Sequence, residues 1–352
     1  MAELRIGTCS WKFPSWVGLV YSTPKGAPSA QQADTEARLA EAGPLFEASG
    51  APPDADEVES VGDDAKRARY LVEYAQQYNT VEIDQWFWSL FGPETLGLPD
   101  PADAEAYRAA VTQRSDGGAG FRVTVKAPNS VTLTHFYQQG DEPLRPNPHF
   151  LSTELFASFV ARIAPLHPLL GPIMFQFEYL NKQKMQTQAR FQALFGDFCR
   201  EVRERLSGEF TYGLEVRNPQ YLNRAYFQFL QAFELIPVLV QGYWMPDIRA
   251  VYDAWREMLW NHPAVVIRLM GPDRQAIEKL APTGWHEIVL PKDDELPGIA
   301  KMVEELLDRD LDVYVNVNNH YEGSSPLTIA KLRDLLNVSD PGRASSPRGP
   351  GT

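Results

Sequence analysis

Residues 171–217 decide the fold class. They begin with GPIMFQFEY (Gly171–Tyr179), continue through a segment of helical pattern (Thr187–Leu206) and end with TYGLEVR (Thr211–Arg217). The two outer segments are short runs rich in Ile, Phe, Leu and Val, as expected of strands buried in a parallel sheet. Two parallel strands joined by a helix form a β-α-β unit, so this stretch predicts a parallel sheet covered by helices.

The same alternation extends along the whole chain. The segments with the composition of buried strands are Leu4–Trp11, Thr80–Trp88, Phe121–Ala127, Gly171–Tyr179, Thr211–Arg217, Pro237–Gly242, Ala264–Met270 and Asp312–Val317. The segments with helical pattern are Ala65–Gln77, Ala102–Arg114, Thr153–Ala164, Thr187–Leu206, Arg224–Phe233, Ile248–Leu259, Leu296–Leu307 and Ser325–Leu336. Eight strands, each followed by a helix, predict an α/β fold, a single (β/α)8 barrel of the TIM type. An open doubly wound sheet is the alternative, but no Gly-rich dinucleotide fingerprint follows any strand.

We expect one domain over residues 1–336 and a loose, flexible tail at 337–352, which is rich in Gly, Pro, Ser and Arg. Residues 22–64 form an acidic insertion after the first strand. Between positions 30 and 64, ten Asp and Glu residues accompany a single basic residue, Arg38. A solvated loop is the favoured interpretation of this segment, and an acidic lid over the barrel mouth is the alternative.

Charge and composition narrow the class of protein. The 352-residue chain has a formal net charge of −13 at pH 7, so a broad basic surface for duplex DNA is absent. The sequence contains no run of about 18 apolar residues, so we expect no membrane span. The N-terminus leads directly into a strand-like segment, so we expect no secretory signal. Only two cysteines, Cys9 and Cys199, occur, and they lie far apart. We therefore expect a cytoplasmic protein without a membrane partner.

Polar residues alternate with apolar ones inside the predicted strands. Residues two apart share a face of a strand, so Val81 and Ile83 lie on one face while Glu82 and Asp84 lie on the other. In a barrel the apolar face packs against the helices, and the polar face points into the barrel. The inward charged residues expected near the C-terminal mouth, where barrel active sites form, are Glu82, Asp84, Arg122, Lys126, Glu215, Arg217 and Arg268. Their sum is one positive charge, which suggests an anionic ligand.

A purely structural interpretation of the same residues is an ion-pair network that satisfies itself. Glu215 would pair with Arg217 or Arg268, and Glu82 would pair with Lys126. For any single residue this interpretation is at least as good as a functional one. With Gln176 included, the inward polar residues come from five strands, so the constellation as a whole favours a functional site.

The ordered motifs resemble a known family. These motifs are IGTCSW (Ile6–Trp11), TVEID (Thr80–Asp84), FRVTVKAP (Phe121–Pro128), LTH (Leu133–His135), MFQF (Met174–Phe177), LEVRN (Leu214–Asn218), IRLMG (Ile267–Gly271) and VNVNN (Val315–Asn319). Together they resemble the domain-of-unknown-function 72 family, also called YecE-like. The resemblance implies a TIM-type barrel without an established activity, and polar pocket residues Glu82, Lys126, His135, Gln176, Glu215, Arg217, Arg268 and Asn319. The chain departs from the family pattern at Met270, where relatives usually have His.

The residue types at the predicted mouth suggest acid–base chemistry on an anion. Glu82 and Glu215 could act as general acid and base, and His135 as a proton shuttle. The anion clamp would consist of Lys126, Arg217 and Arg268. Further contacts to the substrate would come from Gln176, Asn319 and Trp11. We therefore expect an enzyme of hydrolase or lyase type that acts on a small anionic substrate, phosphorylated or sugar-like.

Three other interpretations remain at the level of sequence. Glu82, Glu215, His135 and His320 are suitable metal ligands, but no spaced metal motif occurs and the nearby cations would repel a metal, so no metal ligand is assigned and a divalent cofactor is not favoured. A nucleic-acid-binding or phosphodiester-processing protein is the second, with single-stranded nucleic acid stacking on the rim aromatics Trp11, Trp16, Trp86, Phe87 and Trp88. The third is a non-catalytic scaffold.

Overall fold

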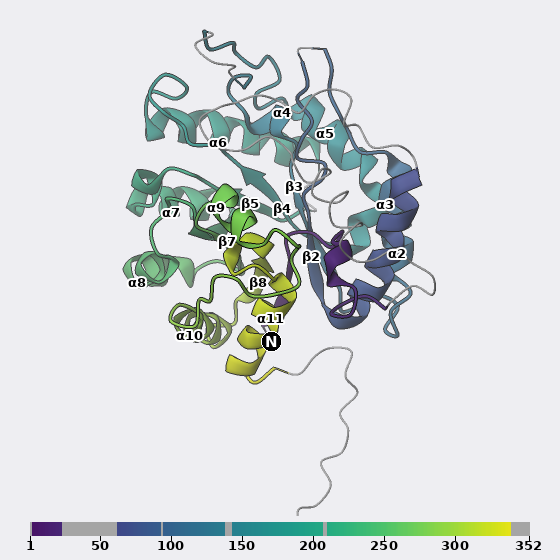
Figure 1. Cartoon of the computed structure of the whole chain (residues 1–352). Helices are drawn as coiled ribbons and strands as arrows, with labels where there is room; N and C mark the ends of the chain where they lie inside the picture. Colours follow the sequence, from purple (N-terminus) through teal and green to yellow (C-terminus); the bar gives the residue numbers. More distant parts are fainter. Residues whose placement is uncertain (1, 23–61, 93, 138–142, 207–209, 339–352) are drawn as a thin grey trace, which may run out of the picture.

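The computed structural model is a closed barrel of eight parallel strands (Figure 1). It describes residues 2–22, 62–92, 94–137, 143–206 and 210–338. The strands are β1 (Leu4–Thr8), β2 (Thr80–Ile83), β3 (Arg122–Lys126), β4 (Leu170–Gln176), β5 (Tyr212–Glu215), β6 (Ile236–Gly242), β7 (Ala264–Gly271) and β8 (Asp312–Val317). Each strand pairs with its neighbours in sequence, and β1 pairs with β8, which closes the barrel. The predicted (β/α)8 fold is confirmed. Most of the predicted insertion and tail lies outside the described residues.

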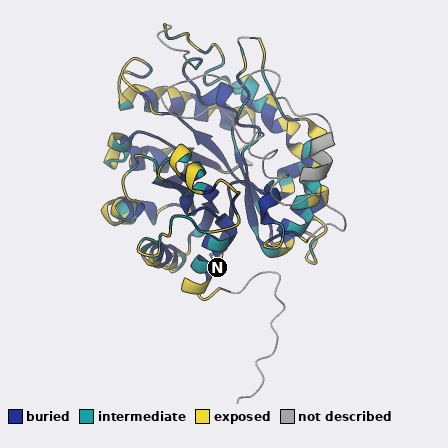
Figure 2. Ribbon diagram, in the orientation of Figure 1, coloured by how far each residue is buried: buried dark blue, intermediate teal, exposed yellow. Residues whose placement is uncertain are grey.

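Helices surround the barrel and cover the outer face of the sheet (Figures 1 and 2). The main ones are α2 (Gly62–Gln77), α3 (Pro101–Val111), α5 (Thr153–Arg162), α6 (Gln188–Arg205), α7 (Arg224–Ala232), α8 (Ile248–Leu259), α10 (Leu296–Leu307) and α11 (Ser325–Leu335). Two short helices, α4 (Asn129–Thr132) and α9 (Arg274–Leu280), follow β3 and β7. Side chains cap several helices: Asn223 accepts a hydrogen bond from the Tyr226 amide, and Asp247 accepts from Arg249 and Ala250. None of the helices in the described residues combines the length and the hydropathy that a membrane-spanning segment needs.

The two faces of each strand have the chemistry that the alternation predicts. Val81 and Ile83 on β2, like Val123 and Val125 on β3, are fully buried in the main core between the sheet and the helices. A smaller apolar cluster fills the N-terminal half of the barrel interior with Met174, Ile236, Val238, Ala264, Val266 and Tyr314. The C-terminal half of the interior holds the polar residues. The barrel interior therefore consists of an apolar layer at its N-terminal end and a polar layer at its C-terminal end.

Burial of His262, between α8 and β7, predicts a dependence of stability on pH. His262 is 5% exposed, and desolvation lowers its pKa to about 4 from an ordinary value of 6.5. The unfolded chain therefore binds a proton more readily, and the stabilisation present above pH 6.5 is lost as the pH falls towards 4. Between pH 6.5 and pH 5 the free energy of unfolding should fall by about 2 kcal/mol because of this group alone.

Chemical denaturation across this pH range would measure the effect. The His262→Leu variant should show a shallower decline in unfolding free energy than the parent chain. His286 is exposed and provides the matched control, so His286→Leu should retain the parent slope. Equal slopes for the parent and His262→Leu would contradict the assignment.

Candidate functional site

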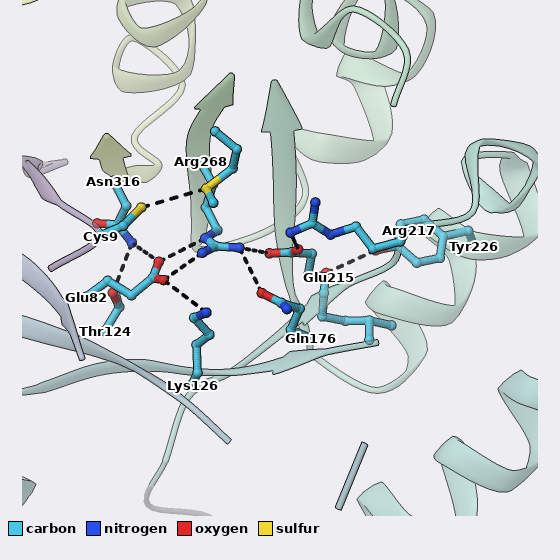
Figure 3. A network of polar contacts seen from close by, with 12 residues as sticks. Cys9, Glu82, Thr124, Lys126, Gln176, Glu215, Arg217, Tyr226, Arg268 and Asn316 are labelled. Atoms are coloured by element: carbon cyan, nitrogen blue, oxygen red, sulfur yellow. Dashed lines mark hydrogen bonds and ion pairs between the residues drawn. The ribbon is translucent and has the colours of Figure 1, made fainter. Parts of the chain in front are cut away.

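Six strands contribute polar side chains to one network in the barrel interior (Figure 3). Glu82 on β2 is in register with Thr124 on β3, Gln176 on β4 with Glu215 on β5, and Arg268 on β7 with Asn316 on β8. All six side chains are at most 4% exposed. Polar groups buried this deeply must satisfy one another or a ligand.

Arg268 lies at the centre of the network. Its Nε donates to Glu82 Oε2 at 2.9 Å, and its Nη2 donates to Glu82 Oε1 at 2.6 Å, which makes a bidentate pair. Its Nη1 donates to Glu215 Oε2 at 2.5 Å and to Gln176 Oε1 at 3.0 Å. Burial alone would lower the pKa of Arg268, but Glu215 and Glu82 raise it well above its ordinary value. One guanidinium therefore holds two carboxylates and an amide from three other strands.

Glu215 is clamped between two arginines. Its second oxygen, Oε1, forms an ion pair with Arg217 Nη2 at 2.6 Å. Burial would raise the pKa of Glu215, but Arg217 and then Arg268 outweigh it and hold that pKa below the ordinary value. Glu215 is therefore ionised at neutral pH, which suits an electrostatic role and does not suit a general acid.

Glu82 has further neighbours on β3 and β8. Asn316 Nδ2 donates to Glu82 Oε2 at 3.2 Å and to Thr124 Oγ1 at 3.0 Å. Lys126 Nζ lies 3.9 Å from Glu82 Oε1, beyond hydrogen-bond distance, and 4.8 Å from the centre of the Phe87 ring. Lys126 therefore contributes a positive charge to the cluster without forming a short ion pair with a carboxylate.

Exposure of the charged groups is graded towards the mouth. The side chains of Glu82, Glu215 and Arg268 are at most 1% exposed, whereas Arg217 retains 9% and Lys126 retains 12%. Three cations accompany two carboxylates in this buried network, a surplus of one positive charge. The sequence count reached the same sum by including Arg122 and Asp84, and Asp84 is half-buried directly after the end of β2, outside the network. The two most accessible members are both cations.

Cys9 and Met270 occupy the same end of the barrel. Cys9 Sγ lies 3.8 Å from Met270 Sδ, and both side chains are buried with Val240 in a small apolar cluster (Figure 3). Desolvation, and then the charge of Glu82, raise the pKa of Cys9 well above its ordinary value, so the thiol is neutral and not an activated nucleophile. Met270 completes this apolar packing.

Three predicted site residues are engaged elsewhere. His135 Nδ1 lies 2.9 Å from Thr134 Oγ1, and burial together with the charge of Lys184 lowers its pKa. Asn319 Oδ1 accepts from the amide and hydroxyl of Ser325, so it fastens the start of α11. Trp11 is 0% exposed and packs edge-on against Tyr107 with ring centroids 5.0 Å apart. Trp11 is therefore buried in the core of this structure, and its assignment as a binding residue stays a prediction.

The charge count expected from the sequence also needs a correction. Arg122 lies at the N-terminal end of β3, where its Nη1 donates to the carbonyls of Ala119 and Phe121, so it does not belong to the mouth. Most of the rim aromatics are packing residues, since Trp16, Trp86 and Phe87 are at most 6% exposed. These three rings therefore expose little surface on which bases could stack.

Three members of the mouth were not assigned roles from the sequence. Thr124 and Asn316 have the inward parity, which was the signal available in the sequence, and the structure places them in register with Glu82 and Arg268. Tyr243 follows the end of β6, where parity no longer applies, and its ring lies 4.5 Å from the Arg217 guanidinium carbon. Among the described residues, no group of three or more His, Cys, Asp or Glu residues is arranged to hold a metal.

Comparison with known proteins agrees with the fold. Residues 58–350 match the model of a family described as "Protein of unknown function DUF72". A solved DUF72 family protein from Enterococcus faecalis has a TM-score of 0.57 and 15% identity, over 96% of both chains. A second, from Thermotoga maritima, has a TM-score of 0.53 and 17% identity, over 95% of this chain and 99% of that one. No curated protein matches the chain.

Proposed function

The chain belongs to the DUF72 family of proteins of unknown function, and from this premise we propose that it binds a small anionic molecule, phosphorylated or sugar-like, at the C-terminal mouth of its barrel. One observation carries the proposal. The buried cluster has one more cation than carboxylate, and the two members with the greatest exposure, Lys126 and Arg217, are both positive. A surplus cation in a protein of net charge −13 favours an anionic partner.

Arg217 and Lys126 have hydrogen-bonding capacity left for a ligand. Arg217 forms an ion pair with Glu215 through Nη2, while its buried Nε has no hydrogen-bond partner within the described part of the chain. The Lys126 ammonium lies 3.9 Å from its nearest carboxylate oxygen. A guanidinium offers two parallel donors to a phosphate or carboxylate, and an ammonium adds a point charge beside it. Together they suit an anion with several oxygens.

The glutamates position these cations in our proposal. Both oxygens of Glu82 are held by Arg268, and the two oxygens of Glu215 are divided between Arg268 and Arg217. Because both carboxylates are occupied and the pKa of Glu215 is lowered, we assign them to positioning rather than to acid–base catalysis. The hydrolase or lyase chemistry expected from paired carboxylates therefore finds little support in this geometry.

Thermal unfolding with inorganic phosphate tests the proposal. Phosphate at about a hundred times its dissociation constant should stabilise the protein by about 2.7 kcal/mol, against chloride at equal ionic strength. Arg217→Ala and Lys126→Ala should each weaken this stabilisation, measured relative to each variant without phosphate. Arg122→Ala is the matched control, because Arg122 lies on the same strand as Lys126 but at the opposite end of the barrel.

The panel also includes a short single-stranded oligonucleotide and a sugar phosphate. Stabilisation of the parent chain and the Arg122→Ala variant but not of Arg217→Ala would support the proposal. Stabilisation by the oligonucleotide alone would replace it with nucleic-acid binding. Equal stabilisation of the parent chain and Arg217→Ala, or none by any anion, would refute the anion site and leave a self-satisfied structural network.

A further inference from the structure

The mouth of the barrel has an apolar half beside its charged half. Tyr243, directly after β6, packs against the buried cluster of Cys9, Val240 and Met270. The guanidinium carbon of Arg217 lies 4.5 Å from the centre of the Tyr243 ring. The boundary between the cationic and apolar halves therefore runs between Arg217 and Tyr243.

The backbone at this boundary is held in an unusual conformation. Gly242 has φ +125°, and Tyr243 has φ +52°, a left-handed value that is uncommon for an aromatic residue. The pairing of β6 with β7 shifts register at this point, and the Tyr243 amide donates to the Gly271 carbonyl at 2.7 Å. Bulges beside functional sites re-aim side chains, and strained residues persist only where the surroundings fix them. The fold thus fixes the direction of Tyr243.

Trp244 continues this aromatic surface into solvent. It follows Tyr243 in the connection from β6 to α8, at the C-terminal end of the barrel, and it is 48% exposed. The two ring centroids lie 5.9 Å apart with an angle of 59° between the planes. Tyr243 and Trp244, here called the aromatic wall, therefore join a half-buried ring beside Arg217 to an exposed indole.

We propose that the ligand of the mouth carries a planar ring next to its anionic group, and that the aromatic wall contacts this ring while Arg217 and Lys126 hold the anion. The inference rests on the proposed function and narrows its substrate class from small anions in general to ring-bearing ones. Aromatic surfaces bind planar rings through offset or edge-on stacking, and an indole offers the largest such surface. An aliphatic anion would leave the exposed Trp244 indole without a role in recognition.

Calorimetric titration with three probes tests the inference: inorganic phosphate, glycerol phosphate and phenyl phosphate. The parent chain should bind phenyl phosphate about tenfold more tightly than glycerol phosphate, because only the former can stack. Trp244→Leu should reduce this preference to about twofold and leave the affinity for inorganic phosphate unchanged. Trp260, at the C-terminal end of α8 and thus at the opposite end of the barrel, supplies the control Trp260→Leu, which should keep the full preference.

The outcomes separate the two proposals. If all three probes bind through Arg217 and phenyl phosphate has no advantage, the ring-bearing substrate class is wrong and the anion site stands. The ring-bearing class is also wrong if Trp244→Leu and Trp260→Leu lower the preference equally. If none of the probes binds the parent chain, the anion site is wrong and the inference falls with it.

Discussion

Replacement of Arg268 by alanine should lower the free energy of unfolding by about 3–5 kcal/mol, the range typical of a buried ion pair that loses one partner. Arg268 is 1% exposed and is paired directly with both Glu82 and Glu215. Its loss would leave Lys126 at 3.9 Å as the remaining ion-pair partner of Glu82, beside the Asn316 hydrogen bond, and Arg217 as the remaining ion-pair partner of Glu215. Chemical denaturation at pH 7 would measure the change.

Two comparisons make this prediction specific. Arg108 forms an ion pair with Glu105 in which both side chains are more than 40% exposed, so Arg108→Ala should change stability by less than about 1 kcal/mol. The combined variant Glu82→Gln, Arg268→Met removes the bidentate pair together and should recover about half of the loss, because Glu82 no longer carries an unpaired charge and Glu215 keeps its ion pair with Arg217. A loss for Arg268→Ala no larger than that for Arg108→Ala would show that the network contributes little to the fold.

Substitution of Gly271 by alanine is expected to be the most damaging single methyl addition at the mouth. Gly271 has φ +84°, and a Cβ there would lie 2.0 Å from the carbonyl oxygen of His320. Because the obstructing atom belongs to the backbone, the end of β7 and the connection that follows β8 would have to separate. We expect a loss of unfolding free energy above about 3 kcal/mol, together with loss of the hydrogen bond that fixes Tyr243.

Gly117 provides the matched control for this substitution. It also has a left-handed backbone, with φ +65°, but a Cβ built on it meets no atom within 4 Å. Gly117→Ala should therefore show only the conformational cost of about 1 kcal/mol. Equal losses for the two variants would mean that the close approach of β7 to the β8 connection does not constrain the mouth.

Alternation within the strands was sufficient to predict which residues point into the barrel. Glu82, Gln176, Glu215 and Arg268 all have inward parity in the sequence and all meet in one network. The pairing of Glu215 with Arg217 and Arg268 was predicted and is confirmed, whereas the pairing of Glu82 with Arg268 was not predicted, because pairing across the interior depends on the relative heights of strands that are not neighbours. The expected pair of Glu82 and Lys126 forms only at 3.9 Å. Lys126 lies two residues beyond Thr124, the register partner of Glu82, and Arg268 makes the short contacts to Glu82.

Residues beyond the strand ends were much harder to place. Trp11, His135 and Asn319 follow β1, β3 and β8, where the chain turns and the two-residue period no longer fixes direction. Trp11 turned into the core, and Asn319 turned back to hold α11. Tyr243 reaches the mouth through a register shift and a left-handed backbone that sequence alternation cannot reveal.

A crystal structure of the protein grown with inorganic phosphate would test the anion site most directly. We predict a phosphate at the mouth with oxygens about 3 Å from Lys126 Nζ and from the Arg217 guanidinium, while Arg268 still holds Glu82 and Glu215. The proposal would be contradicted by a structure in which phosphate binds elsewhere or not at all, and in which Lys126 and Arg217 contact only their own glutamates.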